Sequence, residues 1–109
     1  MKTYIVVASA LSDESAETYT TEALLALDED ERDERGLIVR YASTLREARS
    51  LAVEVVAEWI VMRLSCGLPY DNEYVAQAPR WLAACARLDA GSVLRDVETT
   101  NTTIGIRRI

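Results

Sequence analysis

Residues 44–66, TLREARSLAVEVVAEWIVMRLSC, carry the strongest local structural signal in the chain. Thr44 followed three residues later by Glu47 is a capping box, in which two side chains satisfy free backbone donors at the start of a helix. The apolar residues behind this box recur at helical spacing on one wide face; they are Leu45, Ala48, Leu51, Ala52, Val55, Val56, Trp59 and Ile60. We therefore expect a long helix whose apolar face, Val56 and Trp59 included, lies in the core.

This helix should span Leu45–Cys66 and form the spine of the domain. Gly67 follows it directly and Pro69 comes two residues later. Glycine takes the left-handed conformation that closes a helix, and proline cannot continue the backbone hydrogen bonds.

Strands are predicted on both sides of the helix. Lys2–Ala8 is apolar or β-favouring at both alternating sets of positions, as a central strand buried on both faces requires. Leu37–Tyr41, which follows Gly36, is a second β-branched run. Near the C-terminus, Ser92–Val97 and Thr103–Ile109 predict two strands joined by a turn into a hairpin.

Between the long helix and the hairpin, the sequence predicts helix interrupted by a proline. Asp71 or Asn72 can cap a helical segment. Pro79 should break that segment or begin a new one in its first turn, because proline lacks the amide donor. We expect a helix over Arg80–Leu88.

The segment 13–35 is ambiguous. It contains a helical stripe of apolar residues, but the run Thr18–Thr21 favours a strand. If the helix continued through the charged run, Asp28 with Arg32 and Glu31 with Arg35 would form pairs four residues apart; otherwise the run is a solvated loop. A helix here would make the first two strands a right-handed parallel crossover.

The resulting expectation is one compact domain over residues 1–109, of the α+β class. A small mixed or antiparallel sheet, built from the first, second and C-terminal strands, should pack in two layers against two or three helices. The principal helices are Leu45–Cys66 and Arg80–Leu88.

Composition limits the class of protein. Half of the 109 residues are hydrophobic and 28% are charged, as in ordinary globular domains. Glu54, Glu58 and Arg63 interrupt the longest apolar helix, so no membrane span is expected. Two cysteines, Cys66 and Cys85, in predicted helices point to free thiols in a reducing compartment, and we expect a cytoplasmic protein.

Several kinds of chemistry lack the residues they need. The chain has no histidine, which removes the commonest general base and metal ligand. Neither cysteine has a lysine or histidine nearby in sequence to activate it, and their spacing is not that of a zinc site. We expect no enzyme, although a small enzyme using carboxylates alone stays open as an alternative.

Cofactor and metal sites are not expected either. The four glycines are isolated, so no glycine-rich loop can hold a phosphate. The run from Asp28 begins like a calcium loop, but Arg32 occupies the third ligand position and Asp33 replaces the glycine of the sharp turn.

Charge is the feature that points to function. Residues 13–35 carry ten acids against Arg32 and Arg35, a net charge of −8, whereas the whole chain has −6. Such a surface either keeps the protein soluble or binds a basic, nucleic-acid-binding surface on another protein. The candidate contact residues are Asp28, Glu29, Asp30, Glu31, Asp33 and Glu34.

The order of elements resembles that of small phage-encoded inhibitors, including anti-CRISPR proteins. The resemblance lies in the short N-terminal strand, the strand Gly36–Tyr41 running directly into Ser43–Ala52, the terminal strands and the acidic character. It implies a protein, acting in the host cytoplasm if phage-encoded, that blocks a DNA-binding or nuclease-recruiting surface of a bacterial immunity effector without catalysis.

Two functions from different classes therefore remain. In the first, the chain is a non-enzymatic inhibitor that binds a protein partner through its acidic surface, with no direct contact to nucleic acid or membrane. In the second, it is a structural module, an oligomerisation unit or an adaptor, whose acidic face is merely solvating. The sequence is compatible with a homodimer.

Overall fold

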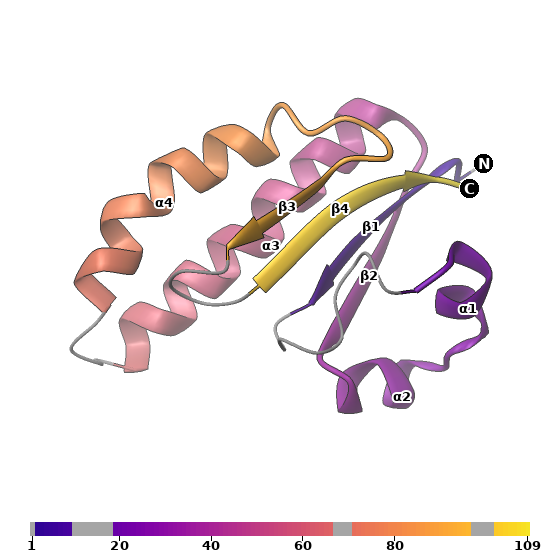
Figure 1. The fold of residues 1–109 in the computed structure, drawn as a ribbon, viewed down its shortest axis with the longest axis horizontal. Coiled ribbons are helices and arrows are strands. Elements are labelled where there is room, and N and C mark those ends of the chain that lie inside the picture. Colours follow the sequence, from indigo (N-terminus) through magenta and orange to yellow (C-terminus); the bar gives the residue numbers. More distant parts are fainter. Residues whose placement is uncertain (1, 10–18, 67–70, 97–101) are drawn as a thin grey trace.

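The computed structural model describes residues 2–9, 19–66, 71–96 and 102–109. The elements follow one another as β1 (Tyr4–Ser9), α1 (Thr21–Ala26), α2 (Glu29–Glu34), β2 (Leu37–Ala42), α3 (Leu45–Cys66), α4 (Asp71–Cys85), β3 (Val93–Asp96) and β4 (Thr102–Arg108). A four-stranded antiparallel sheet lies against α3 and α4 (Figure 1). The predicted α+β fold is confirmed.

The sheet has the strand order β2-β1-β4-β3, with β1 and β4 at its centre. Tyr4 of β1 pairs with Ala42 on one side and with Arg108 on the other. The central position predicted for the first strand is therefore confirmed, and so is the C-terminal pairing of β3 with β4. The turn expected between those two strands falls at residues 97–101, outside the described residues.

The parallel crossover that a helix over 13–35 would have made between the first two strands does not occur. Ser9, the last residue of β1, pairs with Leu37, the first residue of β2, so the two strands are antiparallel. The connecting segment leaves and re-enters the sheet at the same end. Because α1 and α2 have six residues each, neither carries the chain along the sheet to its other end, as a parallel crossover requires.

The long helix α3 begins and ends as predicted. Thr44 Oγ1 accepts a hydrogen bond of 3.0 Å from Glu47 N, while Glu47 Oε2 accepts one of 2.9 Å from Ser43 N. The backbone hydrogen bond from Ser43 is the main cause that holds the pKa of the Glu47 carboxyl below its usual value. Trp59 and Val56 are buried, at 7% and 1% exposure, which confirms their place in the core.

Helix α4 differs from the prediction at Pro79. It runs without interruption from Asp71 to Cys85, with Pro79 inside it. The proline removes one backbone hydrogen bond, but the buried residues Ala78 and Cys85 hold the helix on either side of it. Packing against α3 thus outweighs the local cost of the proline.

Both faces of the sheet are covered. Val6 and Ala8 of β1 belong to the main core with α3 and α4, whereas Ile5 and Val7 belong to a second cluster. Leu24 of α1 is fully buried in this second cluster. The α1 segment therefore lies on the face of the sheet opposite α3, where the prediction had assigned no helix.

Candidate partner-binding surface

The six candidate acids are brought together on one short helix. Asp28 is the N-cap of α2, and its Oδ1 accepts a hydrogen bond of 2.8 Å from Glu31 N. Acids in the first turn also suit the positive end of the helix dipole. All six carboxylates are exposed; they are Asp28, Glu29, Asp30, Glu31, Asp33 and Glu34. We call these residues the acidic α2 surface.

The two arginines of this segment turn back toward the body of the protein. Arg32 Nη2 donates a hydrogen bond of 3.2 Å to the carbonyl oxygen of Leu24, and its Nε is buried without a partner. Arg35 Nη1 donates one of 2.6 Å to the hydroxyl of Tyr19. The expected pairs Asp28–Arg32 and Glu31–Arg35 are absent among the described ion pairs, which join Lys2 to Glu47 and Arg49 to Asp89.

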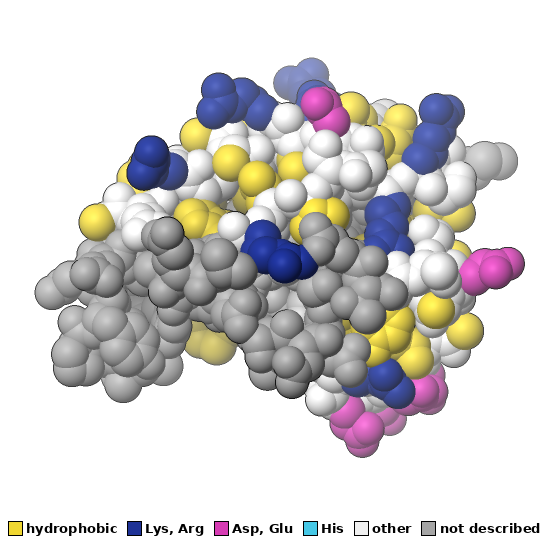
Figure 2. Space-filling view, viewed as in Figure 1, with side chains coloured by type: hydrophobic (Ala, Val, Ile, Leu, Met, Phe, Trp, Pro, Cys, Tyr) yellow, Lys and Arg dark blue, Asp and Glu magenta, His cyan; other side chains and the backbone are white. Residues whose placement is uncertain are grey.

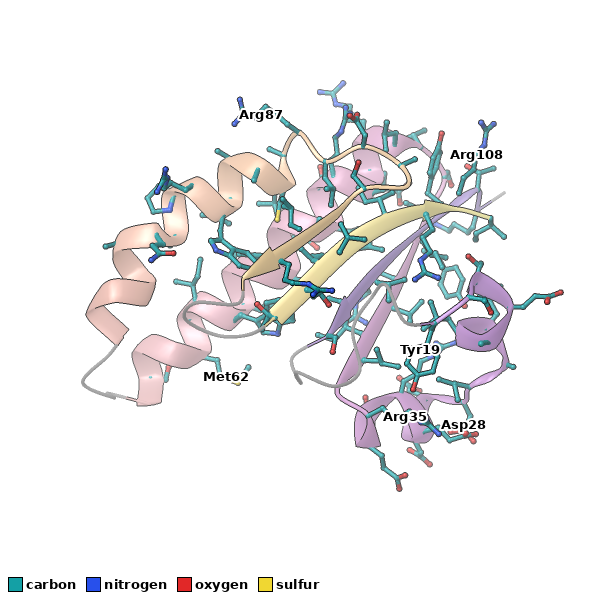
Figure 3. All side chains as sticks on the ribbon, viewed as in Figure 1. Tyr19, Asp28, Arg35, Met62, Arg87 and Arg108 are labelled. Atoms are coloured by element: carbon teal, nitrogen blue, oxygen red, sulfur yellow. The ribbon has the colours of Figure 1, made fainter. Side chains whose placement is uncertain are left out.

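The segment that carries this surface is attached to the sheet through Leu24 of α1 and through Tyr19, which lies just before the N-cap of α1. Leu24 packs in the second cluster with Ile5 and Val7, and Arg107 of β4 donates a hydrogen bond to the carbonyl oxygen of Tyr19. Figure 3 shows Tyr19 and Arg35 directed toward each other between α1 and α2, with Asp28 at the outer side of α2. The acids are thus presented by a helix with a defined place on the fold.

Acidic side chains are most concentrated at one corner of the visible face. Figure 2 shows them gathered where α2 lies, with a basic side chain beside them, while other basic side chains are spread over α4 and the neighbouring strands. Residues 13–18, which carry further acids of the segment 13–35, lie outside the described residues. The described acids of α2 thus lie together at one corner of the molecule.

The thiols offer little reactivity where the structure describes them. Cys85 is fully buried, and burial raises its pKa from an ordinary 9.0 to about 11. A thiol of that pKa is almost wholly protonated at neutral pH and a poor nucleophile. The side chain of Cys66 lies outside the described residues.

The residues that the structure describes contain no group of three or more His, Cys, Asp and Glu side chains placed to hold a metal ion. Within the same ranges, no helix combines the length and apolar character that crossing a bilayer demands.

A cationic groove was not among the predicted sites. Arg46 and Arg49 line it together with Ser50 and Val53 of α3 and with Ala86, which directly follows α4. Arg46 and Arg49 are three residues apart in the predicted long helix, which places them on one face. This spacing was the feature of the sequence that could have indicated a cationic site.

Comparison with protein-family models, with curated proteins and with solved structures found no match for this chain.

Proposed function

We propose that this chain is a non-enzymatic binding protein whose acidic α2 surface docks on a basic, nucleic-acid-binding surface of another protein. An effector complex of bacterial immunity is the candidate partner that the likeness to anti-CRISPR proteins suggests. The observation that carries the proposal is that Arg32 and Arg35 donate hydrogen bonds to Leu24 and Tyr19, while the six carboxylates of the acidic α2 surface are exposed.

Charge of one sign on a fixed helix suits competition with a nucleic acid. Surfaces that bind phosphate backbones are rich in Lys and Arg, and a dense anionic surface is attracted to them over a distance set by the salt concentration. Because Arg32 and Arg35 connect α2 to Leu24 and Tyr19, which are themselves attached to the sheet, the backbone that carries the acids is ordered before binding. Pre-ordering of this kind reduces the entropy cost of association.

A structural or oligomerisation module is the second candidate, and exposed apolar residues on α3 favour it. Val61 and Met62 are 62% and 58% exposed, and they line a shallow groove with Glu54 and Glu58. Met62 extends away from the body of the protein (Figure 3). A second copy covering this face would give a stable homo-oligomer in sizing experiments.

Matched charge-removing variants test the main proposal. Asp30→Asn with Glu34→Gln removes two exposed charges from α2 without touching the cap. Glu54→Gln with Glu58→Gln removes two exposed charges of the same spacing from α3. We expect the α2 variant alone to slow association with a captured nucleic-acid-binding complex, since surface charges act mainly on the association rate.

The capture is made from host lysate at low salt, and a DNA oligonucleotide is then added as competitor. Displacement of the protein by DNA, together with binding that weakens as the screening length falls from about 10 Å at 0.1 M to about 3 Å at 1 M salt, supports the proposal. Equal association rates for the α2 variant and the wild type would refute it. Loss of solubility with unchanged binding would identify a solvating face instead.

A further inference from the structure

A groove of about 520 Å³ lies between the first half of α3 and the end of α4, two helices that run side by side (Figure 1). The described residues that line it are Arg46, Arg49, Ser50, Val53 and Ala86. Its volume falls in the range of about 300–1,000 Å³ that is common for small-molecule sites. The groove combines two guanidinium groups and a hydroxyl with an apolar wall.

Arg49 is held in a fixed position at this groove. Its Nε donates a hydrogen bond of 2.9 Å to the carbonyl oxygen of Leu88, and its Nη2 is 2.9 Å from Asp89 Oδ1. These contacts use one side of the guanidinium and leave Nη1 as a donor. A pre-positioned arginine loses less side-chain entropy when it binds an anion.

Arg46 adds a second cation, and no described carboxylate forms an ion pair with it. It is exposed, and no acceptor among the described residues binds it. The adjacent carboxylate, Glu47, is engaged elsewhere, with Ser43 N at 2.9 Å and Lys2 Nζ at 3.7 Å. Because Arg49 forms an ion pair with Asp89, the positive charge that remains at the groove is that of Arg46.

We propose that this groove binds a phosphate monoester. Arg46 and Arg49 contact the phosphate, Ser50 donates a third hydrogen bond, and the organic part of the ligand lies against Val53 and Ala86. The arginine fork suits both carboxylate and phosphate oxygens, but three separate donor groups can each meet one of the three terminal oxygens of a phosphate monoester, whereas a carboxylate has two oxygens. This site is separate from the acidic α2 surface and does not depend on its function.

Phenyl phosphate is the probe for the test. It is titrated into isotope-labelled protein in low-chloride buffer, and amide shifts report where it binds. We expect shifts confined to the lining of the groove, and weaker binding of inorganic phosphate and of benzoate, which lack the apolar body and the third oxygen respectively. Arg46→Gln should weaken phenyl phosphate about tenfold, the value of one hydrogen bond between charged groups.

Arg108→Gln is the matched control, because it removes the same charge from an exposed arginine at the end of β4. It should bind phenyl phosphate like the wild type, whereas Ser50→Ala should bind it more weakly. Unchanged affinity in Arg46→Gln, or equal losses in Arg46→Gln and Arg108→Gln, would overturn the proposal. Thermal unfolding of each variant verifies that the fold is retained, and the α2 charge variants serve to separate this site from the partner-binding surface.

Discussion

Arg35 of the turn after α2 donates a hydrogen bond of 2.6 Å to the hydroxyl of Tyr19, and its Cζ lies 5.9 Å from the centroid of the tyrosine ring. The two residues are 16 positions apart in sequence. Their contact joins the C-terminal end of α2 to the residue just before the N-cap of α1. Together with the bond from Arg32 to Leu24, it connects α2 to the segment that carries α1.

Tyr19→Phe tests the contact between Tyr19 and Arg35, because it deletes the hydroxyl and keeps the ring. A single hydrogen bond contributes about 1 kcal/mol, so we expect amide hydrogens of α2 to exchange about fivefold faster while global stability changes little. Hydrogen exchange measured residue by residue is the readout. Tyr41→Phe is the control, since Tyr41 is exposed on β2; equal exchange rates in both variants would show that the contact does not restrain α2.

Asp28 has a structural role that can be separated from its charge. Its side chain caps α2 through Glu31 N. Asp28→Ala should cost about 1 kcal/mol of helix stability, whereas Asp28→Asn keeps a capping oxygen and should cost much less. Hydrogen exchange of the α2 amides and denaturant unfolding measure the loss in each of the two variants. An equal loss in the two variants would contradict the cap and assign the effect to charge.

Gly105 lies where β3 and β4 pair closely. A Cβ at this position would lie 2.9 Å from Val93 Cγ2 and 3.1 Å from the carbonyl oxygen of Ser92. Gly105→Ala should therefore destabilise the protein by about 1–3 kcal/mol, as overpacking does, in denaturant melts. Adding Val93→Ala should recover part of the loss, because it removes one of the two contacts; no recovery would place the strain in the Ser92 backbone alone.

Cys85 predicts a decline of stability at alkaline pH. Its thiol has a pKa of about 11 in the folded protein against an ordinary 9.0. Above pH 9.0 the unfolded chain gives up this proton and the folded chain retains it, so the stability that is present below that pH is lost as pH rises toward the folded pKa. The free energy of unfolding of Cys85→Ala, measured across this pH range in a Cys66→Ser background, should decline less than that of the Cys66→Ser protein itself.

Thiol labelling gives an independent measurement on the same residue. In the Cys66→Ser variant, Cys85 should react with a thiol reagent far more slowly in the native protein than in denaturant, because the buried thiol is protonated and inaccessible. Rapid labelling of the folded variant at neutral pH would contradict this expectation.

The elements that could be predicted are those whose signal lies within a few residues. The capping box at Thr44 and the apolar stripe behind it specify α3, and the double-sided apolar pattern of Lys2–Ala8 specifies a central strand. The acidic surface was also visible in advance, because clustered carboxylates avoid burial whichever backbone carries them. Local chemistry decides these features, and tertiary contacts only reinforce it.

Other features depend on residues that are far apart in sequence. Pro79 breaks an isolated helix, yet α4 passes through it because its buried face packs on α3. The direction of β2 follows from pairing Leu37 with Ser9, 28 positions away, which no local pattern encodes. The inward turn of Arg32 and Arg35 depends in the same way on Leu24 and Tyr19, and the cationic groove on the approach of two helices. The sequence by itself determined the long helix α3, the strands and where the acids lie along the chain. The tertiary structure decided the helices α1 and α2, the direction of the strands, the survival of α4 and the exposure of each charge, because these depend on the free energy of contacts formed only after distant segments meet.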